Sequence, residues 1–184
     1  MNTLTVSTWR SQTAEAFESL RFKAVVENLS AKILGKPTKL KSFAEEAFRL
    51  NSQRIEHGEP PFRINSMRIY RGEQDLQVNQ INGSVGRESD FDQHFRPLKK
   101  HLRERWIEVS ALFTTEQVPP ITVYKCGSDY FVEDGHHRVS VARALGQLSL
   151  RAVVWEIPTQ SRKECCEICL PGGQKKKSPA LAHA

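Results

Sequence analysis

Apolar residues recur at three- and four-residue intervals along the first third of the chain, which is the spacing of amphipathic helices. This spacing predicts a helix over residues 13–34, whose apolar side carries Ala16, Phe17, Leu20, Ala24 and Leu29. Gly35 and Pro37 follow it, and both residue types are typical of helix ends. A second helix is predicted from Ser42, a common capping residue, with an apolar side made of Phe43, Ala47, Phe48 and Leu50.

Residues 61–158 show a different pattern, in which short apolar runs alternate with helical spacing. The breaker sequence Gly58-Glu59-Pro60-Pro61 separates this part from a helical N-terminal extension, residues 1–60. Strands are predicted at 63–70, 76–81, 121–125, 130–133 and 150–157. Helices are predicted at 90–114, with a break near Pro97, and at 136–145. This order of elements predicts a mixed α/β, or α+β, domain.

Residues 159–184 form a polar, basic tail without sustained periodicity, and we expect much of it to be disordered. The tail holds a Cys-x-x-Cys pair within Cys165, Cys166 and Cys169. A structural zinc site needs about four ligands, and a redox pair normally begins a helix after a strand. Because the tail offers neither pattern, we interpret these cysteines as incidental and predict no metal site, with a metal or redox role as the alternative.

The composition fits one folded domain with appendages, because 39% of the 184 residues are hydrophobic and 26% are charged. No apolar run approaches the ~18 residues of a membrane span. The first residues also lack the apolar core of a secretory signal. We therefore expect a cytoplasmic protein without a membrane partner.

The net charge of +6 is unevenly distributed along the chain. Basic residues outnumber acidic ones by nine to seven in residues 1–60, by thirteen to twelve in 61–158 and by five to two in the tail. Half of the excess lies in the tail, so charge alone does not favour nucleic-acid binding. The main predicted helix starts with a row of basic residues. We interpret this row as a solvated helix face, with contact to nucleic acid or to a triphosphate as the alternative. It comprises Arg96, Lys99, Lys100, Arg103 and Arg105.

The strongest candidate for a functional site lies within residues 130–146, where a strand, a tight turn and a helix are predicted. The turn and first helical residues read Asp134-Gly135-His136-His137-Arg138. Backbone N–H groups at a helix start favour an anion, and a glycine lets a phosphate approach closely. Arg138 offers a bidentate grip, and the two imidazoles add donors. We expect this end of the helix to face a cleft as a phosphate pocket, with a metal site or a plain helix cap as the alternatives.

A glycine-containing loop, residues 82–87, is the second candidate. It carries Ser84 and Arg87, and its backbone N–H groups with a guanidinium would suit a phosphate or a ribose. The alternative is an ordinary loop with a surface arginine.

Gly135-His136-His137-Arg138, followed by an Ala-containing helix and Gly146, resembles the phosphate motif of the ParB/sulfiredoxin superfamily. The resemblance extends over residues 76–157. It includes the strand pair before the motif, the Gly86-Arg87 element and the Asp90-Phe91-Asp92 sequence. It implies a ParB/sulfiredoxin-like nucleotide-binding domain in which the loop with Ser84 and Arg87 approaches the nucleotide opposite the Gly-His-His-Arg turn.

Departures from the superfamily pattern narrow the expected activity. ParB partition proteins carry DNA-binding and dimerisation regions after this domain, whereas residues 159–184 are all that follow here, so full ParB function is not expected. Sulfiredoxins place a catalytic cysteine where this chain has His136. The Asp-Gly-His-His-Arg form is similar to the free-serine-kinase branch, which implies acidic residues near the phosphates. The candidates for such catalytic roles are Glu133, Asp134 and Glu88, with Asp90 as a further one.

The resemblance therefore implies a nucleotide-binding protein that is an NTP hydrolase or a small-molecule phosphotransferase using ATP or CTP with Mg²⁺. The alternative is a non-enzymatic, nucleotide-switched protein that binds DNA or regulates a partner. The nucleotide is the expected ligand, while nucleic acid and a second copy of the chain stay open as partners.

Overall fold

The computed structural model describes residues 3–58, 60–61 and 68–158. The tail with its three cysteines, and most of the strand predicted at 63–70, lie outside these residues. The helices are α1 (Thr3–Ile33), α2 (Phe43–Glu56), α4 (Arg103–Thr114) and α5 (His136–Ala144). The strands are β1 (Lys41–Ser42), β2 (Ile69–Gln77), β3 (Ile81–Ser84), β4 (Ile121–Cys126), β5 (Asp129–Asp134) and β6 (Ser149–Ile157). Two short 3-10 turns, η1 (Val78–Gln80) and η2 (Lys100–Leu102), complete a mixed α/β fold.

The six strands form one mixed sheet in the order β1-β3-β5-β4-β6-β2. β4 and β5 are an antiparallel hairpin at its centre, and β3 pairs in parallel with β5. β6 lies between β4, to which it is parallel, and β2, to which it is antiparallel. The hairpin therefore carries the end of β5 and the start of α5 into the middle of the sheet.

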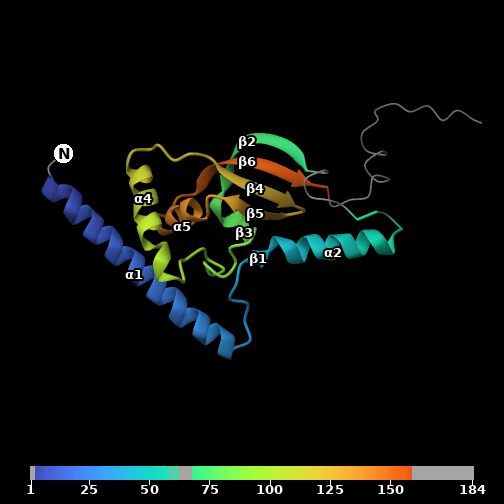
Figure 1. The fold of residues 1–184 in the computed structure, drawn as a ribbon, viewed down its shortest axis with the longest axis horizontal. Coiled ribbons are helices and arrows are strands. Elements are labelled where there is room, and N and C mark those ends of the chain that lie inside the picture. Colours follow the sequence, from blue (N-terminus) through green and yellow to red (C-terminus); the bar gives the residue numbers. More distant parts are fainter. Residues whose placement is uncertain (1–2, 59, 62–67, 159–184) are drawn as a thin grey trace, which may run out of the picture.

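Both faces of the sheet are covered, as the alternating burial of its strands requires. Val123, Val132 and Val154 belong to the core beneath α5, α4 and α1. Tyr124 and Phe131 belong to a second core, where Phe43 of α2 packs with ring centroids 5.1 and 5.3 Å away. Figure 1 shows α4 and α5 beside the sheet, α1 outside α4, and α2 extending from the other side.

The two N-terminal helices, which the sequence predicts as an extension, pack directly against the domain. α1 begins at Thr3, ten residues before the predicted start, and its Phe17 is fully buried 5.9 Å from the ring of Trp106. The linker after α1 forms β1, which pairs with β3 at the edge of the sheet. The predicted apolar sides were partly wrong, because Leu29 and Phe48 are exposed.

Two predicted elements in the middle of the chain were wrong. The strand predicted at 76–81 ends at Gln77 and turns through η1, and residues 82–84 of the predicted loop are strand β3 instead. The helix predicted from residue 90 begins only at Arg103, because the buried Asp92 holds a turn ahead of it. Its Oδ1 accepts backbone N–H groups of His94 and Arg96 at 2.9 and 2.8 Å.

The elements around the candidate turn are confirmed. β4, β5, α5 and β6 lie within a residue or two of their predicted bounds. Trp106 is buried, and its indole N–H donates to Ser140 of α5 at 3.0 Å. Within the described ranges, none of the helices combines the length and the apolar character that crossing a bilayer would require.

Candidate functional site

Gly135 joins β5 to α5 in a conformation that other residues adopt poorly. Its φ is +105°, and a Cβ built on it would lie 2.5 Å from Cγ2 of Ile121. Glycine thus allows the first turn of α5 to rest directly on the start of β4. No side chain of the described residues caps this end of α5, so its first N–H groups and the positive end of the helix dipole lack a side-chain acceptor there.

A cavity of about 300 Å³ opens at this helix end, near the lower limit for small-molecule sites. The first turn of α5 and the end of β5 form one wall, and η2 with α4 forms the other. Its cationic lining is Arg87, Arg105 and Arg138. Leu102 and Val109 also line it, although both are almost fully buried in the core. The structure therefore brings Gly135, Arg138 and Arg87 together in one pocket, from segments about fifty residues apart.

The two histidines are buried, although the sequence indicated that they face a cleft. His136 is 3% and His137 is 8% exposed, and both pack against the ring of Phe91. Burial lowers the pKa of each to about 4, assisted for both by the charge of Arg87. Both imidazoles are therefore neutral at pH 7 and enter the site as hydrogen-bonding groups.

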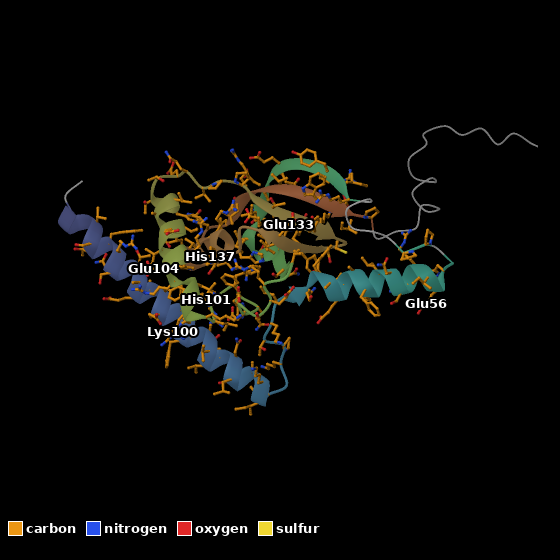
Figure 2. All side chains as sticks on the ribbon, in the orientation of Figure 1. Glu56, Lys100, His101, Glu104, Glu133 and His137 are labelled. Atoms are coloured by element: carbon orange, nitrogen blue, oxygen red, sulfur yellow. The ribbon has the colours of Figure 1, made fainter. Side chains whose placement is uncertain are left out.

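His137 keeps one hydrogen-bonding position unfilled. Its Nδ1 is buried and has no hydrogen-bond partner among the described residues. Leaving such an atom without a partner costs about 1–3 kcal/mol. The ring also lines the pocket, and Figure 2 labels it together with His101, which comes from η2 on the opposite wall. In the tautomer protonated at Nδ1, this nitrogen is a hydrogen-bond donor with no partner among the described residues, on a side chain that lines the pocket.

Ser84 and Arg87 have different positions relative to the pocket. Ser84 is fully buried in β3, where its Oγ lies 2.8 Å from Nε2 of His136 and accepts the backbone N–H of Arg87 at 3.1 Å. It therefore lies behind the histidine and positions it. Arg87 lines the pocket, and its guanidinium donates to Asp90 at 3.1 Å.

Arg138 is held by the protein itself. Its guanidinium donates to the carbonyls of Pro119 and Pro120 and forms an ion pair with Asp134. Its side chain is 12% exposed. Arg138 therefore links the turn before β4 to α5, and only part of its guanidinium group is left to bind a ligand.

The four candidate carboxylates differ in availability. Glu133 accepts the hydroxyl of Tyr124 at 2.8 Å, and Glu88 accepts the backbone N–H of Gly86 at 3.0 Å. Burial would raise the pKa of Asp90, but hydrogen bonding and charge from Lys99, with Arg87, lower it overall. Asp134 is paired with Arg138, but its side chain is 73% exposed beside the pocket, so it is open to a ligand.

His101 and Arg105 line the pocket, although the sequence did not single them out as phosphate-binding residues. The sequence does contain a signal for them, because positions 101, 105 and 109 are spaced for one helical face. Arg105 belongs to the basic row at the start of the predicted helix, for which contact with a triphosphate is the alternative interpretation. Among residues 3–58, 60–61 and 68–158, no cluster of three or more His, Cys, Asp and Glu side chains is arranged to hold a metal ion.

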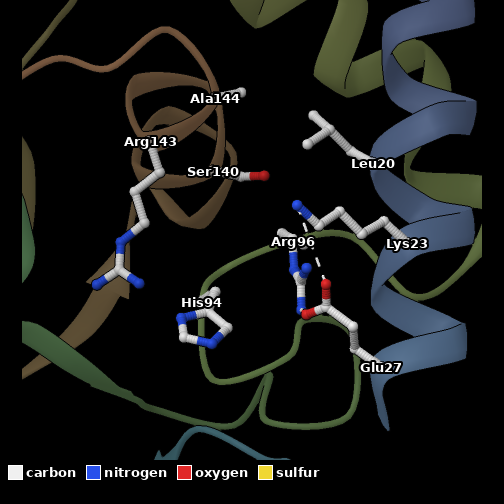
Figure 3. Close-up of a pocket in the computed structure, with 8 residues that line it drawn as sticks. All are labelled: Leu20, Lys23, Glu27, His94, Arg96, Ser140, Arg143 and Ala144. Atoms are coloured by element: carbon white, nitrogen blue, oxygen red, sulfur yellow. Dashed lines mark ion pairs between the residues drawn. The ribbon is translucent and has the colours of Figure 1, made fainter. Parts of the chain in front are cut away.

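A second cavity, of about 390 Å³, lies between α1, the turn at His94 and the far side of α5 (Figure 3). Its charged groups hold the fold together. Arg96 pairs with both Glu27 and Asp92, at 2.7 and 2.6 Å. Arg143 donates to the backbone carbonyls of Val78 and Ile81. These bonds fasten α1 and η1 to the domain, so we assign this cavity a structural role.

Comparison with known proteins adds no relative to this description. No family model, curated protein or solved structure matches the chain. The mixed α/β fold is established by the strands and helices themselves. The ParB/sulfiredoxin-like fold stays a prediction from the motif.

Proposed function

We propose that the protein binds the phosphate chain of a nucleoside triphosphate at the start of α5. The observation that carries this proposal is the convergence of an uncapped helix start, three arginines and two neutral imidazoles on one cavity. Helix N-termini and guanidinium groups are the usual ligands of phosphate in proteins. The resemblance of Gly135-His136-His137-Arg138 to a superfamily phosphate motif supports the same ligand.

Arg105 is the arginine freest to meet a phosphate. Its side chain is 68% exposed, and its ion pair with Glu108 spans one helical turn at 3.1 Å. An exposed ion pair of this kind contributes little stability. A phosphate can therefore replace Glu108 as the partner of Arg105 at little cost in free energy. Arg87 and Arg138 already have protein partners and would supply mainly charge and position.

The neutral histidines make the pocket responsive to the charge of its ligand. An anion near His136 and His137 favours their protonated forms and raises their pKa. Binding of a triphosphate would then take up protons below neutral pH.

Catalysis is a second candidate function, and the exposure of Asp134 beside the pocket favours it. In an NTP hydrolase or a small-molecule phosphotransferase, this carboxylate would orient the water or acceptor hydroxyl. ATP or CTP would bring Mg²⁺, which neutralises phosphate charge when bound. Glu133 and Glu88 are engaged with Tyr124 and Gly86 and would serve as supporting groups.

A nucleotide-switched DNA-binding or regulatory protein stays the non-enzymatic alternative. The basic row offers it limited support, because Lys99, Arg103 and Arg105 each pair with a neighbouring carboxylate. Loss of DNA retention with rising salt would identify phosphate contacts of this kind. Nucleotide turnover in the presence of serine or water alone would identify the enzyme.

Calorimetric titration with each of the four ribonucleoside triphosphates, with and without Mg²⁺, tests the binding proposal. Arg105→Ala should weaken the tightest nucleotide about tenfold or more, since a charge-assisted bond contributes about 1.5–3 kcal/mol. Arg151→Ala is the matched control, because Arg151 is also 68% exposed and also pairs with a glutamate, Glu73, but lies on β6. Absence of binding by any triphosphate, or equal affinities for both variants, would contradict the proposal.

A further inference from the structure

α1 has an apolar stripe that the domain does not cover. Phe22, Leu29 and Ile33 are 69%, 63% and 80% exposed, and Val25 and Val26 are nearly half exposed. The opposite side of the same helix packs on the domain, where Phe17 and Ala24 are fully buried. α1 therefore has two apolar faces, and the described residues of the chain cover only one of them.

The exposed stripe has the spacing of a helix-pairing seam. Residues 22, 26, 29 and 33 are separated by four, three and four positions, as in the apolar repeat of a two-helix coiled coil. No described element covers the seam, because Figure 1 shows α1 as the outermost helix on its side, with α4 between it and the sheet.

We propose that this stripe pairs with the same stripe of a second copy of the chain, with the two α1 helices antiparallel. The symmetry axis would pass near Val25 and Val26. Phe22 of each copy would then lie against Leu29 of its partner. Because the same surface serves both copies, the contact closes on itself and stops at a dimer.

The charges near the two ends of the stripe favour pairing with a second copy of the chain in the antiparallel orientation. Glu15 and Glu18 precede the stripe, Lys32 lies in its last turn beside Ile33, and Lys36 follows the end of the helix. Glu18 also pairs with Arg21 of its own helix at 2.9 Å. An antiparallel pair places the acidic end of one helix beside the basic end of the other. A parallel pair would instead place like charges together, which is unfavourable.

The available area fits a weak, transient interface. Complete burial of the five exposed side chains would remove on the order of 500 Å² per copy, or at most about 1,000 Å² in total, at the lower limit of biological interfaces. The expected dimer is therefore concentration-dependent. The inference does not rest on the proposed nucleotide site, since α1 contributes no residue to that pocket.

Sedimentation equilibrium of the full chain over a hundredfold concentration range tests the proposal. The wild type should show a reversible monomer–dimer equilibrium, and Leu29→Glu should weaken it about tenfold or more, since a change of ~1.4 kcal/mol is tenfold. Phe48→Glu is the matched control, because Phe48 is also exposed and helical but lies on α2. A monomer throughout, or equal weakening by both variants, would overturn the proposal. So would a monomeric wild type that binds anionic lipid vesicles through the stripe.

Charge reversal and cross-linking test the orientation. Glu15→Lys with Glu18→Lys should weaken the dimer, and Lys32→Glu with Lys36→Glu should do the same, whereas a mixture of the two variants should pair well. In a chain whose Cys165, Cys166 and Cys169 are replaced by serine, Phe22→Cys should cross-link with Leu29→Cys but poorly with itself. Efficient self-linking of Phe22→Cys, with no rescue in the mixed charge variants, would exclude the antiparallel pair.

Discussion

The Ser84 hydroxyl lies 2.8 Å from Nε2 of His136, which connects the end of β3 to the first turn of α5. The same oxygen accepts the backbone N–H of Arg87, the residue that carries a guanidinium into the pocket. One buried hydroxyl thus sets the position of two pocket residues from different parts of the chain.

Replacing Ser84 with alanine should lower the free energy of unfolding by about 1–3 kcal/mol, because the buried His136 ring and the partly buried backbone N–H of Arg87 would lose their partner. Chemical denaturation measures this change. Ser110→Ala is the control, since Ser110 is also buried but its hydroxyl donates only to the Trp106 carbonyl within its own helix. Equal, small losses for both variants would mean that the Ser84 bond contributes little.

Gly135→Ala should destabilise the protein by more than a positive φ alone explains. A left-handed backbone costs about 1–2 kcal/mol for a residue with a Cβ, and the close contact with Ile121 adds an overpacking penalty. Gly146→Ala separates the two effects, because Gly146 also has a positive φ but has open space around it. Thermal melts of both variants should show the larger loss for Gly135→Ala, and equal losses would refute the contact.

Stability should fall as the pH drops from about 6.5 to about 4. The unfolded chain binds protons on His136 and His137 near pH 6.5, whereas the folded chain binds them only near pH 4. Unfolding therefore takes up protons in this window, and each histidine contributes up to about 3 kcal/mol. Above pH 5 the carboxyl groups of lowered pKa, such as Asp90, stay ionised and do not contribute.

Urea unfolding at a series of pH values checks this dependence. His137→Gln, which cannot be protonated, should reduce the slope between pH 6.5 and 5 by about half, because His136 still contributes. A wild-type slope that the substitution leaves unchanged would show that other groups cause it.

Arg138→Ala should reduce stability by about 1–3 kcal/mol as well as nucleotide affinity, because the guanidinium bonds to Pro119, Pro120 and Asp134. Arg138→Lys should recover only part of the stability, since an ammonium lacks the planar fork. Denaturation and calorimetric titration of the same variants separate the two roles. Full stability with lost affinity would show that the side chain serves the ligand alone.

The parts of the fold that sequence predicts well are those whose local pattern and tertiary environment agree. β4 and β5 are short apolar runs around a glycine turn, and α5 begins directly after Gly135. Residues 90–102 were mispredicted because a long-range arrangement overrides their helical spacing. There the buried Asp92 binds Arg96, which also holds Glu27 of α1.

The candidate site shows the same division. Gly135, His136, His137 and Arg138 are consecutive, so the sequence reveals them as a group. Their surroundings depend on packing across the sheet, and pattern alone does not show that Phe91 buries the imidazoles or that Pro119 and Pro120 engage Arg138. His101 reaches the pocket only because α4 lies beside α5.

The place of β6 between β4 and β2 has a consequence for synthesis on the ribosome. β2 emerges early, but the strand that pairs it to the rest of the sheet is the last one described. Until residue 157 has left the exit tunnel, β2 and β4 both present unpaired edges, which favour aggregation and chaperone binding. A nascent chain stalled before β6 should therefore be held by chaperones, and release of the complete domain should coincide with insertion of that single strand.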